Sequence, residues 1–333
     1  MKAFVTGGTG FVGSAVVREL LKEGFAVRAL VRQGSDLRNL AGLDVELFHG
    51  DLRDKESLRR GVKGCGALFH VAAHYELWHR DRAIPYAVNV EGTRMLFEEA
   101  ERAGVGRAVY TSSVSTLGIC REKKIGTEET PIDERYIVGH YKKSKYLAER
   151  EVMRFAERGF PVTVVNPSTP IGERDIKPTP TGKIVVDYLN GKMTGYVETG
   201  LNIVDVQDVA KGHLLAFKKG RAGERYILGH RNMTLREIFA QLEKISGVPA
   251  PRFRVPYALA FLAGATDHAV SKITNRRPSV PLDGVKMARK KMFFDSSKAV
   301  RELGLPQSPV EDAFAKACEW FIGHGYVRKG RGA

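Results

Sequence analysis

Tyr141 and Lys145 are two side chains whose types and spacing could carry out proton transfer. Four residues apart on a helix, they lie on the same face. An ammonium group close to a phenol favours the phenolate, so we expect Lys145 to lower the pKa of Tyr141 from about 10 toward neutrality. Such a tyrosine can give a proton to, or take one from, an alcohol or ketone oxygen. The alternative is an exposed helix face on which the pair does no chemistry.

Two serines, Ser112 and Ser113, follow a segment that we expect to be a strand at 107–111. A hydroxyl at the carboxyl end of a strand can hydrogen-bond the same substrate oxygen as Tyr141, because ligands of parallel sheets bind at that edge. Serines are also common turn residues at strand ends. The pair therefore indicates a catalytic site only in combination with the other motifs.

The segment 2–13 has the pattern of a strand, a glycine-rich turn and a helix start. An apolar run at 3–5 predicts a buried strand, and helical periodicity begins at about residue 11. Glycines at three-residue spacing allow a tight turn and a close approach to a pyrophosphate, which the helix N-terminus attracts. The residues expected to hold this group are Gly7, Gly10, Phe11, Val12 and Gly13. An ordinary turn is the alternative, but strand, glycines and helix together make the motif specific.

The elements that must position these residues alternate along the first half of the chain. The patterns predict strands at 26–31, 45–48, 67–71, 107–111 and 162–165, and helices at 11–22, 85–103 and 139–158. Such alternation predicts an α/β fold, a Rossmann-type doubly wound parallel sheet. After Asn166, four prolines predict an irregular crossing, followed by helices at 206–218, 235–246, 257–272 and 310–324.

The bulk properties limit the compartment and the partners. The 333 residues carry a formal net charge of +15, which favours anionic partners. Three widely spaced cysteines and a first strand that starts at once favour a reducing cytoplasm without a signal peptide. No apolar run is long enough to span a bilayer, and no nucleic-acid-binding module accompanies the charge. The apolar segment 257–272 precedes a basic run; we favour a core helix over peripheral membrane contact.

In order along the chain, the motifs resemble those of an extended short-chain dehydrogenase/reductase over nearly its whole length. The matching segments are 6–13, 50–52, 71–73, 89–93, 111–113, 141–145 and 166–168. The resemblance implies that Tyr141 is the general acid/base, that Lys145 holds the nicotinamide ribose and that Ser113, rather than Ser112, is the catalytic serine. It implies a Rossmann domain at 1–166 plus about 200–230, and a smaller C-terminal α/β substrate-binding domain at 167–199 and 231–333.

The same resemblance implies further contacts to a nicotinamide dinucleotide. Asp51 and Leu52 would contact the adenine, and Pro167 and Ser168 would flank the nicotinamide. The other residues implied to bind the cofactor are Ala72, Ala73 and Asn89, together with Tyr141 and Lys145.

The choice between NAD and NADP depends on the end of the second strand. An NAD enzyme commonly has an acidic residue there, to bind the ribose 2′-OH. This strand ends in Arg32, which could meet a 2′-phosphate with help from Arg28 or Arg38. We therefore expect NADP(H), with NAD(H) as the alternative. Arg32 could also face solvent, in an enzyme with a loose choice of cofactor.

The reaction is narrowed by the residues after Ser113. Sugar-nucleotide dehydratases of the family have two acidic residues there, whereas this chain has Val114 and Ser115, so 4,6-dehydration is disfavoured. The segments 72–78, 166–172 and 177–182 resemble the hopanoid-associated sugar epimerase group, whose neighbours are dihydroflavonol-reductase-like enzymes. We expect an epimerase or oxidoreductase of a nucleotide- or lipid-linked sugar in hopanoid biosynthesis. The alternatives are an NADPH-dependent ketone reductase and, as a non-enzyme, an NADP-sensing regulator.

Candidate substrate residues follow the fourth strand and the sixth. His74, Tyr75 and Trp78 could line the substrate pocket, or pack as an aromatic patch under a loop. Arg174 could hold a substrate phosphate, or form a surface ion pair. The histidine spacing matches no metal site, so none is expected. By family analogy we expect a homodimer that is built from the helices at 85–103 and 139–158.

Overall fold

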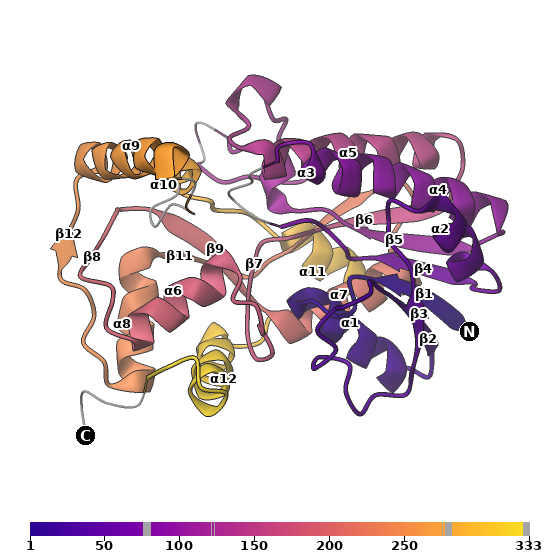
Figure 1. Ribbon diagram of the computed structural model, residues 1–333, viewed down its shortest axis with the longest axis horizontal. Helices are drawn as coiled ribbons and strands as arrows, with labels where there is room; N and C mark the ends of the chain where they lie inside the picture. Colours follow the sequence, from indigo (N-terminus) through magenta and orange to yellow (C-terminus); the bar gives the residue numbers. More distant parts are fainter. Residues whose placement is uncertain (76–80, 121, 123, 275, 277–281, 329–333) are drawn as a thin grey trace.

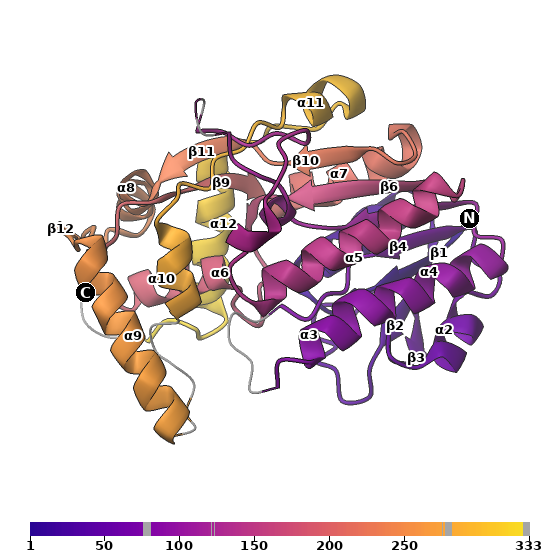
Figure 2. The same cartoon turned by 90° about the horizontal axis from the view of Figure 1, so that it is seen from above.

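The computed structural model describes residues 1–75, 81–120, 122, 124–274, 276 and 282–328. A seven-stranded sheet flanked by helices forms one end of the molecule, and a smaller lobe of helices and short strands forms the other (Figure 1). The carboxyl ends of the strands in the large sheet point toward the junction between these two parts (Figure 2).

Every neighbouring pair of strands in the large sheet is parallel, in the order β10-β6-β5-β4-β1-β2-β3. The strands are β1 (Lys2–Thr6), β2 (Ala26–Val31), β3 (Val45–His49), β4 (Ala67–His70), β5 (Arg107–Thr111), β6 (Val162–Pro167) and β10 (Arg225–Leu228). The chain reverses its direction across the sheet between β1 and β4. This topological switch is where doubly wound sheets bind their ligands, and the predicted fold class is confirmed.

Helices cover both faces of this sheet. On one face lie α1 (Phe11–Lys22), α7 (Val206–Lys219) and α11 (Ser297–Leu303); on the other lie α2 (Lys55–Val62), α3 (Ile84–Tyr86), α4 (Gly92–Arg102) and α5 (His140–Glu157). The predicted single helix at 85–103 is interrupted by the π-helical segment Ala87–Glu91. A π-helical turn contains one more residue than an α-helical turn and so changes the direction of a side chain. Here the π-helical segment contains the buried Asn89, which accepts a hydrogen bond from the loop after β4.

The smaller lobe has its own core. A three-stranded sheet contains β7 (Thr169–Ile171), β9 (Gly200–Asp205) and β11 (Arg231–Thr234), and a two-stranded one contains β8 (Gly195–Tyr196) and β12 (Phe253–Arg254). The helices α6 (Pro180–Leu189), α8 (Leu235–Ser246) and α12 (Val310–Gly323) pack around Tyr188, Phe239, Phe314 and Phe321. Thr234 and Glu237 form the capping box expected at the start of α8.

The expectation of an irregular crossing after Asn166 is wrong in part, because β7 and α6 lie within it. Pro180 is the first residue of α6, and the Thr179 side chain caps that helix. A proline at this position starts a helix rather than breaking one. Residues 206–228 join the large sheet as α7 and β10, whereas β9 pairs within the small lobe.

The helix α9 (Tyr257–Thr274) is not the core helix that its composition suggested. Gly264 packs toward Val285 of α10 (Leu282–Ala288), yet Leu262 is 61% exposed and Ile273 is 85% exposed. The segment is apolar on most sides, so its sequence did not indicate which side faces the protein. Among the described residues, no helix is both long and apolar enough to cross a membrane.

Candidate active site

The glycine turn between β1 and α1 is packed so closely that side chains are excluded. Gly7 has φ +74°, and a Cβ there would lie 2.6 Å from the Ala72 nitrogen. A Cβ on Gly13 would lie 2.0 Å from the Gly7 carbonyl oxygen. Glycine at these positions therefore brings α1 onto the end of β1, and β1 onto the loop after β4.

The N-terminus of α1 is free to bind an anion. Its first residue is Phe11, its N-cap Gly10 provides no side-chain hydrogen bond, and its first turn contains no acidic residue. The first N–H groups of a helix have no partner within the helix, and the helix dipole is positive at this end. A turn without side chains followed by an uncapped helix fits a pyrophosphate.

Gly13→Ala tests this packing. The added methyl group would overlap the Gly7 carbonyl, and overpacking of this kind costs about 1–3 kcal/mol. We expect urea unfolding to show a loss of that size. Gly323→Ala is the matched control, because a Cβ there meets nothing within 4 Å; it should keep or slightly raise the free energy of unfolding. Equal stability of the two variants would contradict this account of the turn.

A directed chain of hydrogen bonds joins β1, β4 and the π-helical segment. Thr93 Oγ1 donates to the Asn89 carbonyl, so it accepts from His70 Nε2 (2.8 Å). His70 Nδ1 then accepts from Thr6 Oγ1 (2.6 Å), which itself accepts from the Ala72 N–H. Burial lowers the pKa of His70 to about 3, which keeps the ring neutral. His70 thus has a structural role under the glycine turn.

Asn89 connects the loop after β4 to the helix that carries Tyr141. Its Oδ1 accepts from the His74 N–H (2.7 Å), and its Nδ2 donates to Ser144 Oγ (2.9 Å) and to the His74 carbonyl. Ser144 Oγ in turn donates to the Tyr141 carbonyl (2.8 Å). Both amide hydrogens are used within the chain, so Asn89, expected at the cofactor, holds the loop after β4 against α5.

Lys145 is 2% exposed and reaches from α5 to the end of β5. Its Nζ donates to Tyr110 OH (3.0 Å) and to the Thr111 carbonyl (2.7 Å). An ammonium group has three hydrogens, so one remains for a further acceptor such as a ribose hydroxyl. Burial lowers the pKa of Lys145 to about 7, although the nearby Glu149 opposes this shift.

Tyr141 lies on the same face of α5, with its ring 4.6 Å from that of Tyr75. Burial, with a smaller contribution from Tyr75, raises the pKa of Tyr141 well above its ordinary value. The expected lowering by Lys145 is therefore wrong for the protein chain itself. The two hydrogen bonds of Lys145 direct its ammonium to Tyr110 and Thr111, so burial dominates and the phenol stays protonated at neutral pH.

Ser113 is more exposed than Ser112. Ser113 is half-buried, and its Oγ accepts from the Ser115 N–H (3.1 Å), which leaves its own hydrogen available. Ser112 is 5% exposed and faces Thr116. The Ser113 carbonyl accepts from Asn166 Nδ2 (3.1 Å), which fixes the segment.

A buried carboxylate that the sequence reasoning missed supports this arrangement. Glu149 Oε2 accepts from Thr116 Oγ1 (2.8 Å) and from Asn166 Nδ2 (3.0 Å), and Oε1 lies 2.9 Å from Arg225 Nε. Glu149 is four residues after Lys145, and this spacing is the signal that would have placed it on the same face. It connects α5 to the ends of β5 and β6.

Two polar side chains at the carboxyl end of β6 have atoms without hydrogen-bond partners. Ser168 Oγ and Asn166 Oδ1 are buried without a hydrogen-bond partner, while the Ser168 N–H donates to the Leu228 carbonyl. Buried polar groups normally have partners. Ser168, expected beside the nicotinamide together with Pro167, thus has a hydroxyl without a hydrogen-bond partner at the carboxyl end of β6.

Comparison with known proteins agrees with this geometry. Residues 3–229 match the NAD dependent epimerase/dehydratase family. This chain belongs to that family. It is 49% identical over 331 residues to a putative dihydroflavonol 4-reductase of Synechocystis sp., with 98% of this chain and 96% of the relative covered. It is 37% identical over 329 residues to Sterol demethylase protein B of Methylococcus capsulatus. This match covers 98% of this chain and 100% of the relative.

A solved structure resembles the whole molecule. It is the structure of a nucleoside-diphosphate-sugar epimerase from Pseudomonas aeruginosa, which is 25% identical to this chain and superposes with a TM-score of 0.81. The match covers 98% of this chain and 99% of that one. The predicted family is confirmed, and the chain is an NAD(P)-dependent enzyme of the epimerase or reductase kind.

Arg32, the residue expected to meet a 2′-phosphate, follows directly after β2. Its side chain is exposed and forms no hydrogen bond or ion pair with any described residue, whereas Arg28 bonds to Glu46 and Arg38 bonds to Asp36. Its charge adds to that of Arg53 in lowering the pKa of Asp51, so Arg32 and Asp51 lie near each other. The Asp51 carboxylate is paired with Arg53 (2.9 Å).

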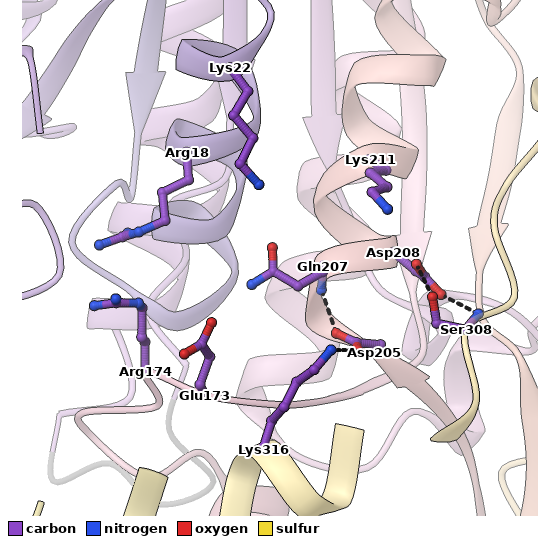
Figure 3. A pocket seen from close by; sticks show the side chains of 10 residues that line it. All are labelled: Arg18, Lys22, Glu173, Arg174, Asp205, Gln207, Asp208, Lys211, Ser308 and Lys316. Atoms are coloured by element: carbon purple, nitrogen blue, oxygen red, sulfur yellow. Dashed lines mark hydrogen bonds and ion pairs between the residues drawn. The ribbon is translucent and has the colours of Figure 1, made fainter. Parts of the chain in front are cut away.

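Not all of the predicted site residues come together. Leu52 is 6% exposed and packs on Gly92, and Trp78 lies outside the described residues. His74 and Tyr75 lie in the loop that Asn89 holds. Arg174 lines a cavity of about 320 Å³ beside α1 and α7 (Figure 3). The other residues around that cavity are Arg18, Lys22, Glu173, Asp205, Gln207, Asp208, Lys211, Ser308 and Lys316.

Proposed function

We propose that this protein is a reductase that converts a ketone to a secondary alcohol with NADP(H). The observation that carries the proposal is the placement of Tyr141 on the same face of α5 as the buried Lys145, whose Nζ is fixed by Tyr110 and Thr111. A phenol that is protonated at neutral pH can give its proton to the oxygen of a ketone as the alcohol forms. The same residues serve the reverse oxidation when the phenol loses its proton.

The roles of the side chains follow from their contacts. The free hydrogen of Ser113 Oγ would hydrogen-bond the ketone oxygen, and Tyr141 would transfer its proton to that oxygen as the alcohol forms. When Lys145 is protonated, the third hydrogen of its Nζ would hold a ribose hydroxyl. The glycine turn, Pro167 and Ser168 would hold the dinucleotide, which when bound supplies the hydride that reaches the carbonyl carbon.

We propose a hydrophobic ketone as the substrate class. The two curated relatives are named as a putative dihydroflavonol 4-reductase and as Sterol demethylase protein B, and both names refer to polycyclic skeletons. Arg174 lines the cavity beside α1 and α7 rather than the loop after β4, so it gives no support to a sugar-phosphate contact beside Tyr141.

The second candidate is an NAD(P)-dependent sugar epimerase that acts on a nucleotide- or lipid-linked sugar in hopanoid biosynthesis. The similarity to a nucleoside-diphosphate-sugar epimerase supports it, as does the resemblance of the segments 72–78 and 166–172. An epimerase would need Tyr141 first as base and then as acid. Net oxidation of NADPH by a hydrophobic ketone would support the reductase; interconversion of two sugar epimers without net cofactor turnover would contradict it.

Arg32→Ala tests the preference for NADP(H). A hydrogen bond between charged groups contributes about 1.5–3 kcal/mol, so the variant should bind NADPH about tenfold to a hundredfold more weakly and NADH unchanged. Arg38→Ala is the control, because Arg38 is already paired with Asp36. Affinities for the two cofactors can be compared by fluorescence titration. An equal loss for NADPH and NADH would assign Arg32 no role in selecting the phosphate.

We also propose a homodimer through α4 and α5, as the family resemblance implied. Light scattering would measure the mass directly. A measured mass equal to that of one chain at micromolar concentration would contradict the proposed homodimer.

A further inference from the structure

The helix α9 presents an apolar stripe to solvent. Leu259, Leu262, Val270 and Ile273 recur at helical spacing and are 58%, 61%, 44% and 85% exposed. At 1.5 Å per residue, the stripe from Leu259 to Ile273 is about 21 Å long. Half of the large exposed apolar side chains among the described residues lie between 253 and 273. Isolated exposed residues are ordinary, whereas a contiguous stripe marks an interaction surface.

The surroundings of this stripe are strongly basic. The segment 252–291 contains nine lysines and arginines and two aspartates, so it carries +7 of the total +15. Lys286 and Arg289, from α10 and the residue that follows it, are exposed close to α9. An apolar helix face flanked by basic side chains is typical of a helix that lies in the interface of an anionic membrane.

The stripe is separated from the start of α5 by one helix, α10. α10 lies between α9 and the rest of the molecule (Figure 2). A Cβ on Gly139, the N-cap of α5, would lie 3.0 Å from Asp283 Oδ2 of α10. Tyr141 follows two residues later in the sequence. A surface that binds α9 would therefore lie on the side of the molecule where the catalytic helix begins.

We propose that the α9 surface, formed by this stripe with Lys286 and Arg289, docks on an anionic phospholipid membrane. The enzyme would then meet a substrate dissolved in that membrane near the start of α5. A second copy of the chain is a poorer occupant, since two basic surfaces repel each other face to face. The inference concerns where the enzyme works, and it does not depend on the reaction assigned above.

The test is flotation of the purified full chain with vesicles. Vesicles of equal phosphatidylglycerol and phosphatidylcholine should bind the protein, and phosphatidylcholine vesicles should bind it at least about tenfold less. Leu262→Ser with Ile273→Ser should lower binding by about tenfold or more, since each removes an exposed apolar side chain from the contact. Ile322→Ser, 52% exposed on α12, is the matched control and should bind as wild type.

Charge is tested separately. Lys286→Glu with Arg289→Glu should lower binding to the anionic vesicles, whereas Arg301→Glu on α11 should lower it much less. Absence of wild-type binding to anionic vesicles would overturn the proposal. So would a stripe variant that binds vesicles as wild type but halves the mass in light scattering, because the stripe would then be an interface between two copies. Turnover of a soluble ketone is measured in parallel, so a failed function and a failed membrane contact give different results.

Discussion

Replacing Tyr141 by Phe is expected to lower the turnover number by about 10²- to 10⁴-fold, the usual contribution of a positioned acid. The substitution removes one hydroxyl and keeps the ring that contacts Tyr75. Binding of NADPH, measured by fluorescence titration, should change by less than about twofold, because the loss falls on proton transfer. The measurement is the rate of NADPH oxidation with a saturating ketone.

The control for this substitution lies on the same helix. Tyr146→Phe removes a hydroxyl near Glu134 and Arg150, away from Ser113. It should retain the wild-type rate within about twofold. Equal rates for Tyr141→Phe and wild type would remove Tyr141 from the mechanism and would favour the cofactor-sensing regulator.

Lys145→Met is expected to have a large effect of a different kind. Without the ammonium, NADPH should bind about tenfold to a hundredfold more weakly, as expected for the loss of a charged hydrogen bond. Turnover should fall as well, because the cofactor is less well oriented. Lys143→Met is the control, since Lys143 is exposed on α5. An unchanged NADPH affinity in Lys145→Met would contradict the role proposed for Nζ.

The burial of Lys145 also predicts that the stability of the wild-type protein depends on pH. The folded-state pKa of Lys145 is about 7, below its unfolded value of about 10.4. Between these values the unfolded chain binds the proton and the folded chain does not, so stability rises with pH in this window. Relative to Lys145→Met, the wild type should gain about 2–4 kcal/mol in free energy of unfolding from pH 7 to pH 10. Parallel curves for the two proteins would show that Lys145 is not buried as described.

The parallel sheet and the helix at 139–158 could be predicted because their signals are local. The glycine spacing from Gly7 to Gly13 and the interval from Tyr141 to Lys145 follow from backbone geometry, and the alternation of apolar runs follows from burial on both faces of the sheet. The capping box at Thr234 could likewise be read from residue types at a fixed spacing.

Properties that depend on packing between distant segments could not be predicted. The pKa of Tyr141 is set by burial and by the partners of Lys145, which are Tyr110 and Thr111 on another strand. The neighbours of Arg174 come from α1, α7 and α12. The exposure of Ile273 depends on α10 covering only one side of α9. In each case residue type was informative, but the deciding contact lies far away in sequence.

The most direct test of the central claim is to identify the nucleotide that the protein binds. Freshly purified protein is denatured, any released nucleotide is identified by mass spectrometry, and an empty protein is titrated with NADPH and NADH. The account predicts an empty protein that binds NADPH more tightly than NADH. A stoichiometric nucleotide retained through purification would instead favour the epimerase, which reuses its cofactor in place. A protein that releases no dinucleotide and binds neither NADPH nor NADH would contradict the site built here from the glycine turn, Tyr141 and Lys145.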